Sequence, residues 1–181
     1  MTAPATNSSA TWKIDPSHSS VEFSAKHMMF TTVKGRLSDV EGTVDIKGDA
    51  PESASVNVTM KAASIDTRSE QRDGHLRSAD FLDVENFPDV TFKSTRISGA
   101  KDHFTIIGNL TIRGTTKPVT LDATYEGTGI DPWGGERLGF SADAKIDRRE
   151  FGLTWNQALE AGGVLVSNDI KLHIDAQLVR A

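Results

Sequence analysis

The sequence predicts an all-β protein, in which antiparallel strands follow one another in a closed up-and-down barrel or in a sandwich. Two observations carry this prediction. From Trp12 onward, polar and apolar residues alternate with a period of two, as they do in strands that bury one face. Between the alternating runs, clusters of Gly with Asp, Lys, Thr or Pro mark turns. Two segments that lack the alternation are predicted to be short helices.

The alternating runs indicate about eight strands, or nine if the short first run is counted. Each run has an apolar face that we expect to point inward. In chain order, the runs lie at residues 12–14, 20–29, 40–46, 56–62, 90–94, 104–112, 119–125, 138–146 and 170–178. Turns are expected at 48–49, 99–102, 114–118 and 127–129.

Small residues on the apolar faces favour the barrel over the sandwich. Ala25 shares a face with Phe23, and Ala142 shares one with Phe140. Small inward side chains leave room inside, and an eight-stranded barrel is about wide enough to hold one small or slender ligand. Periodicity by itself does not separate the two folds.

Two segments are predicted to be helical. In the first, Ser69 is a suitable N-cap for a helix that runs to about Ala79. The second covers Leu153 to Ala161 and is expected to end at the glycine pair 162–163. Both segments interrupt the run of strands and therefore connect one strand to the next.

The first helical segment is dense in charge, which raises the question of whether it does chemistry. As a long connection, it has to cross an open end of the barrel. We expect its charges to face water and to anchor it through Arg72, Asp73 and Arg77. Leu76 and Phe81 are expected to turn inward and close the apolar interior. The charge is predicted to be architectural.

A second charged cluster, Arg148 with Arg149, follows the strand at 138–146. The favoured interpretation is an ion pair with acidic residues of the first helical segment. Contact with a polar ligand head is the alternative.

Composition bounds the protein further. The chain has 181 residues, enough for one domain, which we place at residues 11–181 after a flexible tail at residues 1–10. The net charge of −5, with scattered Lys and Arg, argues against nucleic acid as a partner. No apolar run is long enough for a membrane-spanning helix, and there is no cysteine. The N-terminus lacks the pattern of a secretory signal, so the expected location is the cytoplasm.

Candidate catalytic and metal-binding residues are few. His27 lies on an apolar strand face, where an internal hydrogen bond, a contact to a ligand or a metal are the alternatives. A zinc site needs three or four converging ligands, and no histidine pair is spaced to supply them. Asp15, Ser17 and His18 lie too close along one extended segment for a catalytic triad. No catalytic residue, metal site or cofactor is predicted.

Four blocks of the sequence follow the order and spacing of a known family: WKIDPSHSSVEFSAKH, SIDTRSEQRDGHLRSADFLDVENFPDVTFKST, GNLTIRGTTKPVTL and IDRREFGLTWN. Through these blocks the chain resembles the YceI-like family of polyisoprenoid-binding proteins, and the resemblance covers about Trp12 to Val179. The resemblance implies an extended lipocalin-like barrel that holds a long isoprenoid or similar lipid-like molecule in a central tunnel, with no catalytic activity. Family members with a leader would be periplasmic. The bulky Met28-Met29-Phe30 departs from the expected pattern and would narrow one end of the pocket.

These observations together predict a non-catalytic protein that sequesters or carries a long-chain isoprenoid, either a polyprenyl compound or an isoprenoid quinone. Two alternatives stay open: an enzyme acting on such a molecule, and a packed barrel that works through protein contacts. A homodimer is also left open. The ligand-binding residues, chosen by inward parity and from the first helical segment, are Phe23, Ala25, His27, Met60, Leu76, Phe81, Phe92, Phe104, Ile106, Leu121, Tyr125, Phe140, Leu172 and Ile174.

Overall fold

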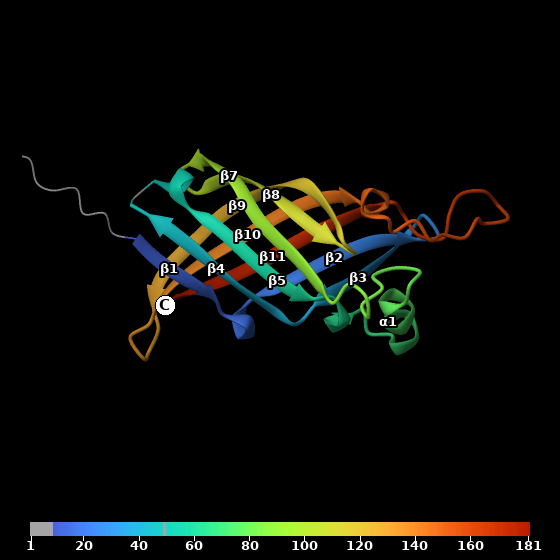
Figure 1. Ribbon diagram of the computed structural model, residues 1–181, viewed down its shortest axis with the longest axis horizontal. Coiled ribbons are helices and arrows are strands. Elements are labelled where there is room, and N and C mark those ends of the chain that lie inside the picture. The colour runs from blue at the N-terminus through green and yellow to red at the C-terminus, as the bar shows by residue number, and fades with distance from the viewer. Residues whose placement is uncertain (1–8, 49) are drawn as a thin grey trace, which may run out of the picture.

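Antiparallel pairing joins all eleven strands into one sheet (Figure 1). The computed structural model describes residues 9–48 and 50–181. The strands are β1 (Ser9–Ile14), β2 (Ser20–His27), β3 (Thr31–Leu37), β4 (Val40–Lys47), β5 (Ser55–Lys61), β6 (Ile65–Asp66), β7 (Asp89–Ala100), β8 (His103–Ile112), β9 (Thr115–Ile130), β10 (Glu136–Asp147) and β11 (Asp169–Arg180). The helical elements in the described ranges are α1 (Glu70–Arg77) and the 3-10 turns η1 (Pro16–His18), η2 (Pro51–Ser53), η3 (Ala62–Ser64) and η4 (Arg148–Phe151).

The sheet closes because β11 pairs with the first two strands, with β1 at Trp12–Ile14 and with β2 further along. β1 and β2 act as one long strand interrupted by η1. In the same way, β3 continues into β4, and β5 continues through η3 into β6, since β4 pairs with β5 and β3 with β6. The result is a closed antiparallel barrel of eight strands, which confirms the predicted fold class.

The sequence pattern missed β3. This strand reads TTVKGRL and has few large apolar residues to show alternation. Its Gly35 pairs with Phe23 of β2, and the Phe23 ring lies where a side chain on Gly35 would be. The glycine is therefore required by packing, and the same glycine weakens the pattern that would have revealed the strand.

The second predicted helix, Leu153 to Ala161, is wrong. These residues form an irregular loop that folds back on itself, with the Leu165 N–H donating to the Gln157 carbonyl. The glycine pair 162–163 makes the tight turn, with φ of 90° and 89°. Side-chain hydrogen bonds from Arg148 take up backbone carbonyls that a helix would need. The first helix is confirmed: α1 begins after Ser69, whose hydroxyl accepts a hydrogen bond from the Arg72 N–H.

Ser9 and Ala10, assigned above to the tail, belong to β1 and pair with Lys47 and Ile46. The rest of the predicted tail, residues 1–8, lies outside the described residues.

One end of the barrel, here called the α1 end, gathers several connections that are far apart in sequence (Figure 1). The His75 ring of α1 stands edge-on to Trp155 of the loop before β11, with ring centroids 4.6 Å apart. The Met28 N–H, in the turn after β2, donates to the Leu165 carbonyl at 2.9 Å. The opposite end, called the far end, carries the C-terminus and the connections β4–β5, β7–β8 and β9–β10.

The packed hydrophobic core occupies the half of the barrel next to the α1 end. Phe151 of η4 is its largest fully buried side chain, at 1% exposure. Leu82 and Val84, which follow α1, pack against the same cluster. The buried members are Val40, Met60, Ala62, Val90, Phe92, Leu110, Ile112, Val119, Ile146, Phe151 and Leu153.

Candidate functional site

A cavity of about 410 Å³ lies inside the barrel, within the range of about 300–1,000 Å³ typical of small-molecule sites. Its wall is drawn from β1, β2, β4, β5, β7, β8, β9, β10 and β11. Inward parity explains this composition, because alternate residues of each strand point to the interior. The barrel is thus packed in one half and hollow in the other.

Nine of the residues predicted to bind ligand line this cavity. They are Met60, Phe92, Phe104, Ile106, Leu121, Tyr125, Phe140, Leu172 and Ile174. The structure brings them together from six strands. Their contact with a ligand stays a prediction.

The other five predicted residues lie outside the cavity wall. Phe23 is on the inner face, opposite Leu172, but its ring covers Gly35 in the packed half. Ala25, two residues further along β2, lies beyond Phe23 toward the α1 end. Phe23 and Ala25 could contact a ligand only if the packed half of the barrel rearranged.

His27 does not point into an apolar interior as its parity predicts. It is exposed at the last position of β2 and bridges to Val166. The chain turns immediately afterwards, with positive φ at Met28 and Met29. The strand therefore ends at the rim of the barrel, where alternation along the strand no longer determines whether a side chain points inward or outward.

Leu76 and Phe81 lie at the α1 end and are not among the residues of the cavity wall. Phe81 is buried and packs against the rings of His75 and Trp155, at centroid distances of 5.0 and 5.4 Å. The following residues Leu82 and Val84 pack against the core cluster, so this segment covers the packed half of the barrel.

Sequence reasoning missed several wall residues. Val44, Val58 and Ala142 share the inner face with the predicted residues of their strands or their neighbours, so parity alone would have found them. Pro51 and Ala54 belong to the β4–β5 connection, where no periodic signal exists.

The floor of the cavity faces the α1 end. The wall residues Met60, Phe92, Leu110 and Val119 are buried and also belong to the packed core. The Phe92 ring lies against Gly108 of β8, where there is no space for a β-carbon. The missing side chain at Gly108 therefore makes room for the Phe92 ring at the floor of the cavity.

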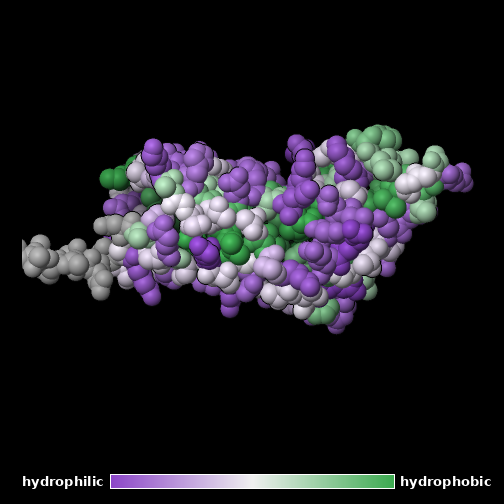
Figure 2. Space-filling model, turned by 90° about the horizontal axis from the view of Figure 1, so that it is seen from above, coloured by the Kyte–Doolittle hydropathy of each residue, from purple (hydrophilic) through white to green (hydrophobic). Residues whose placement is uncertain are grey.

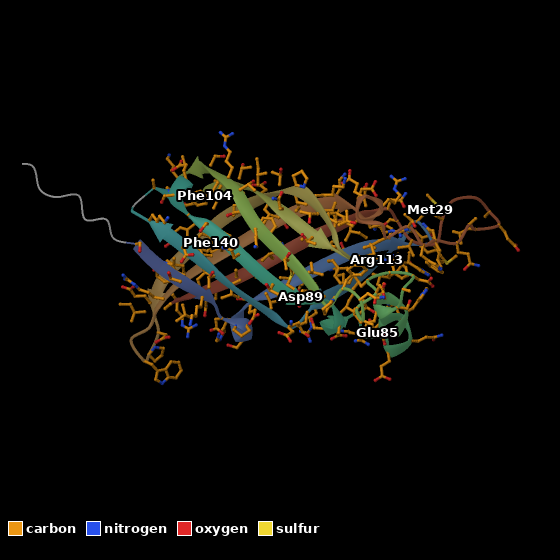
Figure 3. The ribbon with its side chains drawn as sticks, viewed as in Figure 1. Met29, Glu85, Asp89, Phe104, Arg113 and Phe140 are labelled. Carbon is orange, nitrogen blue, oxygen red and sulfur yellow. The ribbon has the colours of Figure 1, made fainter. Side chains whose placement is uncertain are left out.

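The mouth faces the far end. Phe104, Tyr125 and Phe140 are half-buried, in contrast to the buried floor. Figure 3 shows Phe104 and Phe140 at the end of the barrel opposite Met29 and Glu85. Tyr125 pairs with Phe140 across β9 and β10, with ring centroids 5.4 Å apart.

The wall is almost entirely apolar. Its polar members are Ser19, Ser20, Ser141, Asp175 and the hydroxyl of Tyr125. The Asp175 carboxylate lies 3.2 Å from Nε2 of His173, which also faces Asp143 on the neighbouring strand. A wall of this kind attracts apolar surface and offers a bound charge no compensation.

Arg72, Asp73 and Arg77 anchor α1, as predicted, but the expectation that all these charges face water is wrong for Asp73. Asp73 is buried and accepts hydrogen bonds from the Thr67 N–H at 2.9 Å and the Thr67 hydroxyl at 2.5 Å. Arg72 donates from Nε to the same hydroxyl and from Nη2 to the Thr67 carbonyl, both at 2.7 Å. Arg77 donates to the carbonyls of Ala63 and Ile65. These bonds fasten α1 to η3, β6 and the residue that follows.

The predicted ion pair between Arg148 or Arg149 and acidic residues of this segment is wrong. The Arg148 guanidinium bonds backbone carbonyls, and Arg149 pairs with its neighbour Asp147 at 2.6 Å. Because Thr67 already satisfies Asp73, no buried carboxylate of the segment is left to attract them.

Asp73→Ala is expected to lower the free energy of unfolding by about 1–3 kcal/mol, because the buried N–H and hydroxyl of Thr67 lose their acceptor. Asp80→Ala is the matched control: Asp80 pairs with His75 at the surface, and such a pair contributes about 0–1 kcal/mol. Urea denaturation of both variants measures the difference. Equal stability of the two would show that Asp73 is not an anchor.

Asp15, Ser17 and His18 do contact one another, but not as a triad. The His18 Nδ1 lies 2.8 Å from the Asp15 carboxylate and 3.0 Å from the Ser17 hydroxyl, so one ring nitrogen faces both groups. The hydrogen bond from Ser17, with others from His18 and Arg137, lowers the pKa of Asp15 well below its usual range. The Asp15 side chain caps η1 by accepting from the Ser17 N–H, and none of the three residues belongs to the cavity wall.

Within residues 9–48 and 50–181, no three His, Asp or Glu residues are grouped as metal ligands. The same part of the chain contains no helix with the length and hydrophobicity needed to span a bilayer.

Comparison with known proteins agrees with the fold. The family described as YceI-like domain matches residues 12–178. Protein YceI of Salmonella newport is 44% identical over 147 residues, which cover 80% of this chain and 77% of the relative. The crystal structure of the Campylobacter jejuni YceI protein has a TM-score of 0.74 at 31% identity, covering 86% of this chain and 90% of that one.

Two more distant structures share the fold alone. Burkholderia cenocepacia BcnA has a TM-score of 0.79 at 21% identity, covering 91% of this chain and 98% of its own. A polyisoprenoid-binding domain from Saccharophagus degradans has a TM-score of 0.68 at 11% identity, covering 95% and 99%. The family match, which extends over nearly the whole chain, and the 44% identity to Protein YceI establish that this chain belongs to the YceI-like family.

Proposed function

We propose that this protein binds the apolar chain of a polyprenyl compound or isoprenoid quinone in its barrel cavity and carries or sequesters it without chemical change. The observation that supports this most directly is the cavity itself: about 410 Å³ with an apolar wall and half-buried aromatic residues at its mouth. The Saccharophagus degradans domain that shares this fold is described as polyisoprenoid-binding, which is consistent with the proposal.

Affinity would come from burying the chain. Each Å² of apolar surface removed from water contributes roughly 25 cal/mol, so a long chain gains more than a short one until the cavity is full. Because the wall offers few polar groups, the head of the ligand would stay at the mouth, near Tyr125 and Phe140. Discrimination among heads is therefore expected to be weak and discrimination by chain length strong.

The two alternatives have less support. A packed barrel would not leave a cavity of about 410 Å³. An enzyme needs titratable groups beside its substrate, and among the described wall residues only Tyr125 and Asp175 titrate. Asp175 is already engaged by His173.

Binding is tested by native mass spectrometry of the purified protein, organic extraction, and titration with quinones whose prenyl chains increase in length. We expect one ligand per chain and an affinity that rises with chain length and then levels off. The same quinone head without a prenyl chain is the control and should not bind. If neither prenyl quinones nor fatty acids bind at micromolar concentration, the proposal is wrong.

A further inference from the structure

The connection between β9 and β10 carries two of the most exposed hydrophobic side chains in the described structure. Trp133 is 87% exposed and Ile130 is 75% exposed. The hairpin overhangs the barrel, because β9 pairs with β8 only up to Thr124 but continues to pair with β10 up to Ile130. The tip therefore stands clear of its neighbours at the far end.

The turn that presents Trp133 is held by a network of hydrogen bonds. The Asp131 carboxylate accepts from the N–H groups of Trp133 at 3.0 Å and Gly135 at 2.8 Å, and from Nε of Arg137 at 2.8 Å. Arg137 in turn donates to Asp15 at 2.6 Å, which ties the turn to the barrel. These hydrogen bonds fix the backbone of the turn that carries the exposed indole.

The tip projects past the mouth of the cavity, at the same end of the barrel. Tyr125 and Phe140, which flank the mouth, lie on the same two strands as the tip. The other exposed apolar cluster, Met28–Phe30, is at the α1 end, over the packed half. Figure 2 shows hydrophobic residues gathered at that end, and hydrophilic residues flanking a hydrophobic band along the middle of the barrel.

We propose that Trp133 and Ile130 insert into the interface of a lipid bilayer and set the mouth of the cavity against it, so that an apolar ligand passes between bilayer and cavity without crossing water. The inference rests on the proposed function, since it gives that ligand its route. Trp is suited to this position because its ring is apolar while its N–H bonds water or headgroups.

Two observations favour a bilayer over a protein partner. A stable protein interface buries about 800 Å² on each side, far more than two side chains at a hairpin tip supply. Shallow insertion of apolar side chains at the headgroup level needs only the tip itself. The charges nearby are paired with one another, Asp131 with Arg137 and Glu136 with Arg180, so binding should not require anionic lipid.

The test compares Trp133→Ser with Phe30→Ser. Phe30 is the matched control because it is also an exposed aromatic residue, at 73%, but lies at the α1 end. The probe is a vesicle of phosphatidylcholine, used by flotation and by quenching of tryptophan fluorescence with brominated lipid. We expect Trp133→Ser to bind vesicles about tenfold more weakly and to take up ligand from them more slowly by a similar factor. Phe30→Ser should behave as the wild type.

Ligand offered from ethanol, without vesicles, separates this proposal from the proposed function. If Trp133→Ser binds such ligand normally and also binds vesicles normally, the docking proposal is wrong and the proposed function stands. If the wild type binds vesicles through Trp133 but takes up no ligand in either format, the proposed function is wrong. The proposal is also wrong if Phe30→Ser, and not Trp133→Ser, loses vesicle binding. It is wrong as well if sedimentation shows a dimer that Trp133→Ser dissociates while vesicle binding stays unchanged.

Discussion

Arg148→Leu is expected to lower the free energy of unfolding by about 3 kcal/mol or more, since each buried polar group left unpaired costs about 1–3 kcal/mol. The guanidinium is inside the protein, with Arg148 only 3% exposed. It donates to the carbonyls of Ser167 at 2.9 Å, Leu153 at 2.7 Å, Trp155 at 2.9 Å and Val166 at 3.4 Å. Leucine fills part of the volume but satisfies none of these acceptors.

Arg149→Leu is the matched control, because Arg149 is the next residue and carries the same charge. Its side chain is 56% exposed and pairs with Asp147, so its loss should cost about 0–1 kcal/mol. Urea denaturation of both variants, with proteolysis of the 153–166 loop as a second readout, measures the effect. If the two variants unfold at the same urea concentration and the loop is cut no faster in Arg148→Leu, Arg148 does not hold the loop.

This arginine also shows why the second predicted helix was wrong. Residues 153–161 have acceptable helix propensity and end at two glycines, which is all that the sequence reveals locally. The competing interaction comes from Arg148, which bonds the carbonyls of Leu153 and Trp155 from outside the segment. Tertiary hydrogen bonds of this kind override propensity and leave no periodic trace.

The faces of the strands were predictable because parity decides them. Phe140 and Leu172 point inward as their alternation indicates, and both line the cavity. Position along the barrel axis was not predictable in the same way. Phe23 has the right parity yet lies in the packed half, because its ring fills the space over Gly35. Which half of the barrel is hollow depends on contacts between strands that are distant in sequence.

Ala142→Phe is expected to weaken binding of a prenyl quinone by at least tenfold, about 1.4 kcal/mol, while leaving the barrel folded. Ala142 lies in the cavity wall of β10, opposite Ala123 on β9 and Ile174 on β11. Because Ala142 and Ala123 are both small and adjacent, the cavity is wide at this level of the barrel. A phenyl ring from Ala142 would occupy the hollow that the ligand chain needs, and it would bury apolar surface there without displacing packed neighbours.

Ala144→Phe provides the control, since Ala144 is two residues further along β10 and on the same inner face, but packs against the core cluster. There the added ring has no space, and overpacking is expected to cost about 1–3 kcal/mol of stability. Thermal unfolding and a quinone titration on both variants distinguish the two positions. If the half of the barrel around Ala142 is hollow, Ala142→Phe should be as stable as the wild type but bind no quinone, and Ala144→Phe should be destabilised. If Ala142→Phe unfolds as readily as Ala144→Phe, or if it is stable and binds the quinone as the wild type does, the cavity is not the binding site.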